Sequence, residues 1–223
     1  LKYLLSIVII STISLFLIMQ PDIGQTLLVV FSWGVLIFTS GINIFFLLVF
    51  AIFLSILITF LIIYVPRFDY IQGRIFSFFN RDTGAHNFQS DKAIDSIVSG
   101  GFFGKGIGEG TLKNRVPEAH TDYIISVISE EFGVIAIMLI LLLFLILIYR
   151  VLKKVNYEKN EKAKLVLIGC VSLILMQVTI HVGVNIRLFP TTGMTLPFLS
   201  YGGSSLVGSA ILAGIILNYT KIK

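Results

Sequence analysis

The sequence predicts an all-α polytopic membrane protein with about six transmembrane helices and a large extracytoplasmic loop. Of its 223 residues, 56% are hydrophobic and only 13% are charged, whereas soluble domains carry about 25% charged residues. Residues 23–65, 132–149, 165–186 and 188–220 contain no Asp, Glu, Lys or Arg, and uncharged apolar runs of about 18 residues or more are typical of transmembrane helices. These runs exclude a cytosolic enzyme, a DNA-binding module and a disulfide scaffold, and they lack the period of two that marks the strands of a transmembrane β-barrel.

The individual spans follow from these runs and from the residues that end them. Pro21 cannot continue a helix interior and closes the first span, and a turn at Gly41 and Asn43 separates the second span from the third. At 1.5 Å per residue the third span is about 33 Å long, enough for a bilayer core of about 30 Å. The expected spans are residues 3–19, 23–39, 44–65, 123–149, 165–186 and 204–219.

Basic residues predict the orientation. Residues 150–164 contain six Lys and Arg against two Glu, and short basic loops stay on the cytoplasmic side. Lys2 and the C-terminal Lys221 fall on the same side by alternation, so residues 66–122 and 187–203 face outward. The chain then divides into three transmembrane helices (1–65), a large extracytoplasmic loop (66–122) and three more helices (123–223). We assign the net charge of +5 to this orientation and expect no nucleic-acid partner.

Other sequence features exclude further classes. The single Cys170 permits no internal disulfide and no thiol–metal cluster, and no spacing of His, Cys and carboxylates fits a zinc site. The chain begins at Leu1 without a charged segment or a small-residue cleavage site, so we expect no signal peptide but a piece of a longer membrane protein.

The segment that enters the fourth span carries the first candidate site. Asp122, Ser126 and Ser129 are spaced i, i+4, i+7 and share one helix face, with Glu130 slightly off it. A carboxylate at this outer surface, kept ionised by the positive end of the helix, can act as a general base for a hydroxyl nucleophile. The alternative is structural, because Thr121 or Asp122 can instead cap the helix.

Polar side chains inside the spans are the second signal. Glu130 and Glu131 are costly in a membrane unless they pair or reach a water-filled cavity. A structural role for Glu130, in capping or in pairing with a neighbouring helix, and a role in binding a substrate or cation both remain open. Arg187 lies at a comparable depth as a candidate partner. His181 and Asn185 share a face of the fifth span, where hydrogen bonding between helices is the expected role.

Two glycine-containing segments complete the candidates. Residues 99–110 place Lys105 among glycines whose N–H groups can approach an anion, although the spacing is not that of a Walker A loop; the alternative is a flexible loop. Residues 190–205, which include Ser200, predict a structured loop that dips into the outer interface. Its hydroxyls either satisfy free backbone groups or line a lipid head-group site.

Five of these segments together resemble the SEDS family of bacterial shape, elongation, division and sporulation proteins, which includes FtsW, RodA and SpoVE. They are residues 20–24, 99–106, 117–122, 130–133 and 197–205. The runs at 118–120 and 195–198 look more like FtsW than RodA. The family has ten transmembrane helices, and this chain resembles the last six. The missing helices form one wall of the family's cavity, so we expect these 223 residues to be inactive alone.

The resemblance implies a peptidoglycan glycosyltransferase that polymerises lipid II into glycan strands during septal cell-wall synthesis and releases undecaprenyl pyrophosphate. It places the enzyme in the cytoplasmic (inner) membrane with its active loop outside. The family's essential aspartate corresponds to Asp122, which would activate the acceptor 4-hydroxyl. Candidate substrate-binding residues are His120, Thr121, Ser126, Glu130, Glu131, Lys105, Arg187 and Ser200.

The resemblance also implies partners, namely a class B penicillin-binding protein transpeptidase and divisome membrane proteins. A divalent cation, magnesium or manganese, would help the pyrophosphate leave, although the sequence itself establishes no metal ligands. A lipid II flippase and a non-catalytic scaffold for the transpeptidase are the alternatives. Transporters place ionisable residues near the bilayer midplane, whereas the acids here gather toward the outer edge, which favours the enzyme.

Overall fold

The computed structural model describes residues 2–79, 85–112 and 116–221, and within them the chain forms helices and no strand. The prediction of an all-α fold is therefore confirmed for the described part of the chain. The elements are α1 (Lys2–Met19), α2 (Ile23–Thr39), α3 (Ile44–Tyr64), the short 3₁₀ helix η1 (Pro66–Phe68), α4 (Asp69–Phe79), α5 (Ala85–Gly100), α6 (Ile124–Tyr157), α7 (Glu161–Asn185) and α8 (Gly203–Thr220).

Six of these helices are apolar and correspond to the six expected spans. Four of them, α3, α6, α7 and α8, are long and apolar enough to cross a bilayer, while α1 and α2 are apolar but shorter. Among the six spans, the largest difference from the prediction is at α6, which continues past residue 149 to Tyr157. Charged residues end the membrane-compatible run without ending the helix, because Arg, Leu and Lys are good helix formers. The chain is a multi-pass membrane protein.

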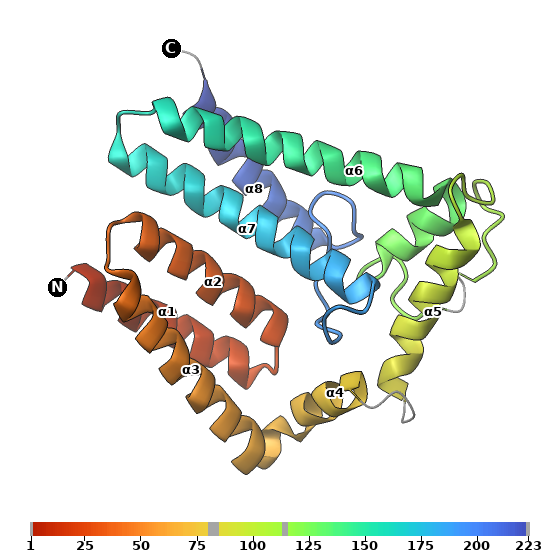
Figure 1. The fold of residues 1–223 in the computed structure, drawn as a ribbon, viewed down its shortest axis with the longest axis horizontal. Coiled ribbons are helices and arrows are strands. Elements are labelled where there is room, and N and C mark those ends of the chain that lie inside the picture. The colour runs from red at the N-terminus through yellow and green to blue at the C-terminus, as the bar shows by residue number, and fades with distance from the viewer. Residues whose placement is uncertain (1, 80–84, 113–115, 222–223) are drawn as a thin grey trace.

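The helices alternate in direction (Figure 1). Both termini and the connection between α6 and α7 lie at one end of the bundle, and α4 and α5 lie at the other. The basic segment 150–164 is therefore at the same end as the N- and C-termini. This is the arrangement that the order of the predicted spans requires.

The polar segment 66–122 contains two helices that the hydropathy analysis did not predict. α4 places Ile71, Ile75 and Phe78 at spacings i, i+4 and i+7, which is the pattern of an amphipathic helix. α5 packs along the first part of α6, and a Cβ atom at Gly100 would overlap the carbonyl of Ser129. Glycine is therefore required where these two helices touch.

A break at Gly133 divides α6. Its backbone has φ 79° and ψ 175°, a conformation that glycine adopts and other residues rarely do. The segment that follows α5 repairs the break: the N–H of Val134 donates to the carbonyl of Gly101 (3.0 Å), and the N–H of Lys105 donates to the carbonyl of Glu130 (2.9 Å). The kink therefore joins the outer loop to α6 through backbone hydrogen bonds.

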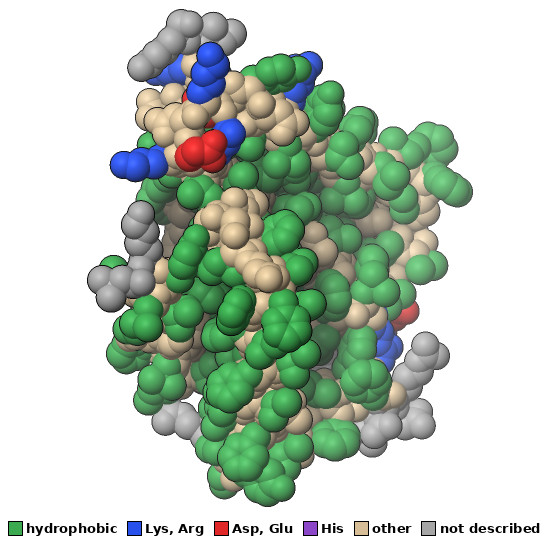
Figure 2. All heavy atoms as spheres, turned by 60° about the vertical axis from the view of Figure 1, so that its left-hand side comes forward, with side chains coloured by type: hydrophobic (Ala, Val, Ile, Leu, Met, Phe, Trp, Pro, Cys, Tyr) green, Lys and Arg blue, Asp and Glu red, His purple; other side chains and the backbone are tan. Residues whose placement is uncertain are grey.

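Large hydrophobic side chains remain exposed over most of the bundle surface. α3 has no buried residue at all, although it is the most hydrophobic helix of the fold. Figure 2 shows one face of the bundle covered mostly by hydrophobic side chains, with many of its charged side chains gathered at the upper rim. Such a surface requires a lipid or protein neighbour, because monomeric soluble proteins rarely expose apolar patches of this extent.

Candidate active site

Asp122 lies in a tight turn immediately before α6. The N–H groups of Thr121, Asp122 and Tyr123 converge on the carbonyl of Glu118, at 3.1, 3.0 and 3.3 Å. Tyr123 is the N-cap residue of α6, and no side chain caps this helix. The alternative in which Thr121 or Asp122 caps the helix is therefore wrong. The Thr121 hydroxyl instead donates to the Glu118 carboxylate (3.0 Å), which leaves the Asp122 carboxylate available for another role.

The backbone on both sides of the Asp122 side chain is held by distant groups. The Asn185 side-chain amide donates to the carbonyl of Asp122 (3.0 Å), and the Ser200 hydroxyl donates to the carbonyl of Thr121 (2.6 Å). The N–H of Tyr201 donates to the preceding carbonyl, at position 120 (2.9 Å). Three consecutive carbonyls are thus fixed by α7 and by the loop before α8. Asn185 bonds to this turn rather than to another membrane helix.

The segment 191–194 of the outer loop lies beside the Asp122 carboxylate. A Cβ atom at Gly193 would lie 3.6 Å from Asp122 Oδ2, and Gly193 has φ +71°. Arg74, from α4, donates from Nη1 to the carbonyl of Thr191 (2.8 Å). Arg74 and Asp122 therefore approach the same short segment from two different elements.

The environment of Asp122 raises the pKa of its carboxyl group. Burial is the largest cause, and repulsion by the Glu118 carboxylate adds to it, while the nearby Thr121 hydroxyl and the positive charge of Arg74 oppose the shift. The sequence predicted the opposite direction, from the positive end of the helix. Desolvation outweighs that dipole because the carboxylate is half-buried. A carboxylate with an increased proton affinity is a better proton acceptor than an ordinary surface aspartate.

Several buried polar atoms around this turn have unused hydrogen-bonding capacity. Among the described residues, no hydrogen-bond partner exists for the Tyr123 hydroxyl, Thr192 Oγ1, His181 Nε2 or Asn185 Oδ1. His181 Nδ1 lies 2.6 Å from a backbone carbonyl, that of Met194, so Nδ1 carries the hydrogen and Nε2 is an acceptor. Buried polar atoms in proteins are normally paired. These four atoms lie on residues of the Asp122 turn, of the outer loop and of the end of α7 that packs against them.

An open cavity of about 620 Å³ lies next to the same turn. Its lining includes His120 and Ser200, two of the predicted substrate-binding residues, together with Ile124, Phe198 and Tyr201. His120 is exposed. The lining thus combines an imidazole and a hydroxyl with apolar side chains, a combination that suits an amphiphilic ligand.

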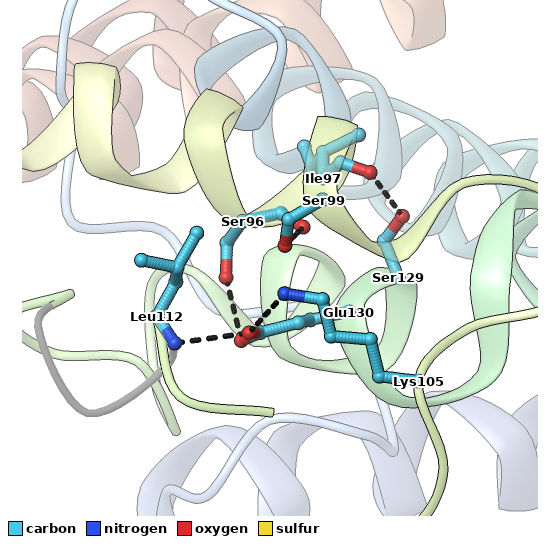
Figure 3. A network of polar contacts seen from close by, with 7 residues as sticks. All are labelled: Ser96, Ile97, Ser99, Lys105, Leu112, Ser129 and Glu130. Atoms are coloured by element: carbon cyan, nitrogen blue, oxygen red, sulfur yellow. Dashed lines mark hydrogen bonds and ion pairs between the residues drawn. The ribbon is translucent and has the colours of Figure 1, made fainter. Parts of the chain in front are cut away.

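Glu130 has a different environment, shown in Figure 3. Its side chain has no exposed surface, and its carboxylate accepts hydrogen bonds from the Ser96 hydroxyl (2.9 Å) and from the N–H of Leu112 (2.9 Å). The Lys105 ammonium lies 3.6 Å from Glu130 Oε1. Of the two roles that the sequence left open for Glu130, the structure shows pairing, and the partner is the outer loop rather than Arg187.

The glycine-rich loop is bonded to α6. The N–H of Gly106 donates to the carbonyl of Glu131 (3.1 Å), and the N–H of Gly108 donates to the Glu131 carboxylate (3.1 Å). Both expectations for residues 99–110 are therefore corrected at these positions. The Gly106 amide meets a backbone carbonyl and the Gly108 amide meets the protein's own Glu131 carboxylate, so neither is left to bind a substrate anion. Hydrogen bonds to α6 hold the loop, because the kink at Gly133 exposes carbonyls that need donors.

The remaining predicted residues lie away from the turn or are already paired. Arg187 forms an ion pair with Asp91 of α5. The Ser126 hydroxyl donates to the carbonyl of Tyr123 (2.7 Å), and both Ser126 and Ser129 are buried. α5 covers this part of α6, so the helix face that Asp122, Ser126 and Ser129 were predicted to share is buried below the turn. The structure gathers Asp122, His120, Thr121 and Ser200 around one turn and places Lys105, Glu130, Glu131, Arg187 and Ser126 elsewhere or in structural contacts.

Arg74 is the residue that the sequence analysis missed. The amphipathic spacing within α4 was a usable signal for a helix in the loop, but nothing in the sequence shows that its guanidinium reaches a carbonyl 117 residues away. Burial lowers the Arg74 pKa, while Tyr123, Asp122 and Asp22 raise it. Because guanidinium groups stay protonated in proteins, Arg74 places a positive charge near Asp122.

Known proteins with similar sequences match most of the chain. The chain is 34% identical over 203 residues to the probable peptidoglycan glycosyltransferase FtsW of Caulobacter vibrioides, an alignment that covers 90% of this chain and 50% of that protein. It is 35% identical over 210 residues to the stage V sporulation protein E of Bacillus subtilis, with 93% and 57% covered. The chain spans about half the length of the curated relatives it matches.

Solved structures agree with the sequence relatives. A peptidoglycan synthase complex, solved to explain how polymerization and crosslinking are coordinated, contains a chain with a TM-score of 0.74 and 27% identity, over 97% of this chain and 60% of that one. A mutant of the rod shape determining protein RodA of Thermus thermophilus matches with a TM-score of 0.63 and 25% identity, over 99% and 58%. The family model of the FtsW/RodA/SpoVE cell cycle proteins matches residues 1–223. With its helix order, its turn at Asp122 and these matches, the chain belongs to the FtsW/RodA/SpoVE (SEDS) family, and it is most like FtsW.

Proposed function

We propose that this chain is part of a peptidoglycan glycosyltransferase that polymerises lipid II into glycan strands during septal wall synthesis. The observation that carries the proposal is the Asp122 carboxylate, which lies in a rigid turn, caps no helix and has a raised pKa. The relatives named peptidoglycan glycosyltransferase FtsW support the reaction class.

The proposed reaction joins the 4-hydroxyl of an acceptor saccharide to the anomeric carbon of a lipid-linked donor. Asp122 accepts the hydroxyl proton as the oxygen attacks, the bond from the anomeric carbon to the pyrophosphate oxygen breaks, and undecaprenyl pyrophosphate leaves with that electron pair. Hydrogen bonds from Asn185, Ser200 and Tyr201 to the turn keep the carboxylate in place. Rigid placement of the base reduces the entropy cost of reaching the transition state.

Five predicted residues have proposed roles around this reaction. His120 and Ser200 line the cavity that would receive the substrate, and Thr121 orients the neighbouring Glu118. Lys105 and Glu130 support the outer loop from a distance. Arg74 joins the set as a positive charge beside the base.

A role for a divalent cation, magnesium or manganese, in the departure of the pyrophosphate stays a proposal. Within residues 2–79, 85–112 and 116–221, no group of three or more His, Cys, Asp and Glu side chains is placed to hold a metal ion. The donor set present does not fit a resident ion, so no step of the proposed reaction uses one.

We place the chain in the cytoplasmic membrane with Asp122 on the extracytoplasmic side. The support is the basic segment 150–164, which lies at the same end of the bundle as both termini and should stay in the cytoplasm. We also propose a class B penicillin-binding protein transpeptidase and divisome membrane proteins as partners. The similarity to a chain of a peptidoglycan synthase complex supports the first of these.

The test replaces Asp122 by Asn in the protein expressed from its full reading frame. Because a general base contributes about 10²-fold or more, we expect polymerisation of labelled lipid II to fall at least a hundredfold, with unchanged expression and transpeptidase binding. Asp95→Asn is the matched control, since Asp95 is half-exposed in a surface ion pair with Lys92 and its loss should leave the rate unchanged. Wild-type polymerisation by Asp122→Asn would contradict the proposal and favour a flippase, which should move labelled lipid across proteoliposomes, or a scaffold.

A further inference from the structure

A second cavity extends from Phe198, which also lines the cavity beside the Asp122 turn, to Arg150 and Lys154 of α6. It has a volume of about 690 Å³ between α6, α7 and α8, within the range of 300–1,000 Å³ that small-molecule sites occupy. Most of its lining residues are apolar, among them Leu143, Leu147, Ile174, Ala213 and Leu217. Nothing in the proposed reaction uses this groove.

One end of the groove is basic. Arg150 and Lys154, one turn apart on α6, belong to the lining. Among the described residues Arg150 makes no ion pair, and the only acidic contact of Lys154 is a loose one to Glu158, at 3.9 Å. The far end is marked by Phe198, whose φ of +66° is rare for an aromatic residue. The groove is therefore apolar along its length and cationic at the end near the termini.

The dimensions match one leaflet of a bilayer. Along α6 the lining runs from Leu143 to Lys154, which is about 17 Å of helix. That is about half of a hydrocarbon core of about 30 Å. The two cations lie at the end of this stretch, where the head groups of that leaflet begin, and a guanidinium there can bind a phosphate through two parallel hydrogen bonds.

We propose that the groove between α6, α7 and α8 binds an anionic phospholipid of the cytoplasmic leaflet. One acyl chain lies along the apolar walls, and the phosphate contacts Arg150 and Lys154. Charge complementarity selects this occupant over a polyprenyl carrier. A carrier whose saccharide reaches Asp122 has its phosphates at the opposite end of the bundle, whereas the cations of this groove lie at the cytoplasmic end.

The experiment is native mass spectrometry of the protein from its full reading frame, with added phosphatidylglycerol, phosphatidylcholine or undecaprenyl phosphate. We expect selective retention of phosphatidylglycerol and about tenfold weaker retention in Arg150→Gln/Lys154→Gln, as the loss of two cation–head-group contacts predicts. Lys159→Gln/Lys162→Gln is the matched control. It removes the same charge from the same basic segment, but neither residue lines the groove.

A second pair of variants tests the apolar part. Ala213→Trp should fill the groove and reduce retention, while Ala210→Trp, on an exposed position of the same helix outside the lining, should not. Thermal unfolding confirms that each variant is folded. Equal losses in both double variants, no effect of Ala213→Trp, or a preference for undecaprenyl phosphate that does not depend on Arg150 and Lys154 would each overturn the proposal.

Discussion

Asp122 and Glu130 lie about two helical turns apart, and the fold gives the two carboxylates opposite environments. Glu130 has no exposed surface and accepts hydrogen bonds from Ser96 and Leu112 beside the Lys105 ammonium. Asp122 is half-buried, and burial together with Glu118 raises its pKa. The Glu130 carboxylate has its hydrogen bonds supplied by the protein, whereas the Asp122 carboxylate retains the proton affinity that a base needs.

The comparison shows why sequence position alone is a poor guide to chemistry. Both acids precede or enter a membrane helix, where an unpaired charge is costly. A buried carboxylate that is fully hydrogen-bonded holds structure together, and removing it leaves its donors unpaired. A carboxylate that is only partly desolvated and weakly bonded has an altered pKa and can exchange a proton.

The largest expected effect is on stability, at Glu130. Glu130→Ala leaves the Ser96 hydroxyl and the Leu112 amide without their acceptor. Each unpaired donor costs about 1–3 kcal/mol, so the free energy of unfolding should fall by about 3–5 kcal/mol. Unfolding in detergent, followed by circular dichroism, measures this effect. Glu161→Ala, which removes an exposed surface pair with Lys164, should change stability little. A Glu130→Ala protein as stable as wild type would remove the contrast with Asp122.

The next largest expected effect is also on stability, at Gly100, where α5 packs on α6. Gly100→Ala places a methyl group against the Ser129 carbonyl, and because backbone cannot move aside easily, we expect a loss of about 1–3 kcal/mol. Gly208→Ala is the control, since a Cβ atom there meets nothing within 4 Å. The same unfolding experiment separates the two variants. If Gly100→Ala is no less stable than Gly208→Ala, the close packing of α5 on α6 does not hold Glu130 in place.

The smallest effect is on the pH dependence of polymerisation and concerns Asp122 alone. A general base must be ionised, so activity is present above its pKa and is lost as the pH falls through it. Glu118→Gln removes a repulsion that raises the pKa, and the acidic limb should move to lower pH. Arg74→Gln removes a charge that lowers the pKa, and the limb should move to higher pH.

Rates of glycan synthesis across a pH series measure both shifts. Glu109→Gln, an exposed change in the glycine-rich loop, is the control and should leave the limb unchanged. Shifts in the same direction for Glu118→Gln and Arg74→Gln would show that another group titrates in the rate profile.

Much of the fold could be predicted from hydropathy. The predicted second span coincides with α2, and the third differs from α3 by one residue, because Asp22 and Asn43 cap these helices with their own side chains and such caps are local. The helices of the 66–122 loop were not predicted, since α4 and α5 are polar enough to resemble a loop. Their stability depends on α6 and the outer loop, which the local sequence does not encode.

The candidate site was likewise predicted only in part from the sequence. The sequence by itself determined the spans, their alternation and Asp122 as the candidate base, because hydrophobic runs and the His-Thr-Asp turn are local signals. Only the tertiary structure decided that Glu130 is a structural residue and that Arg74 lies near Asp122. These contacts join residues up to 117 positions apart. Their partners are chosen by helix packing and desolvation, which depend on neighbours that no local pattern specifies.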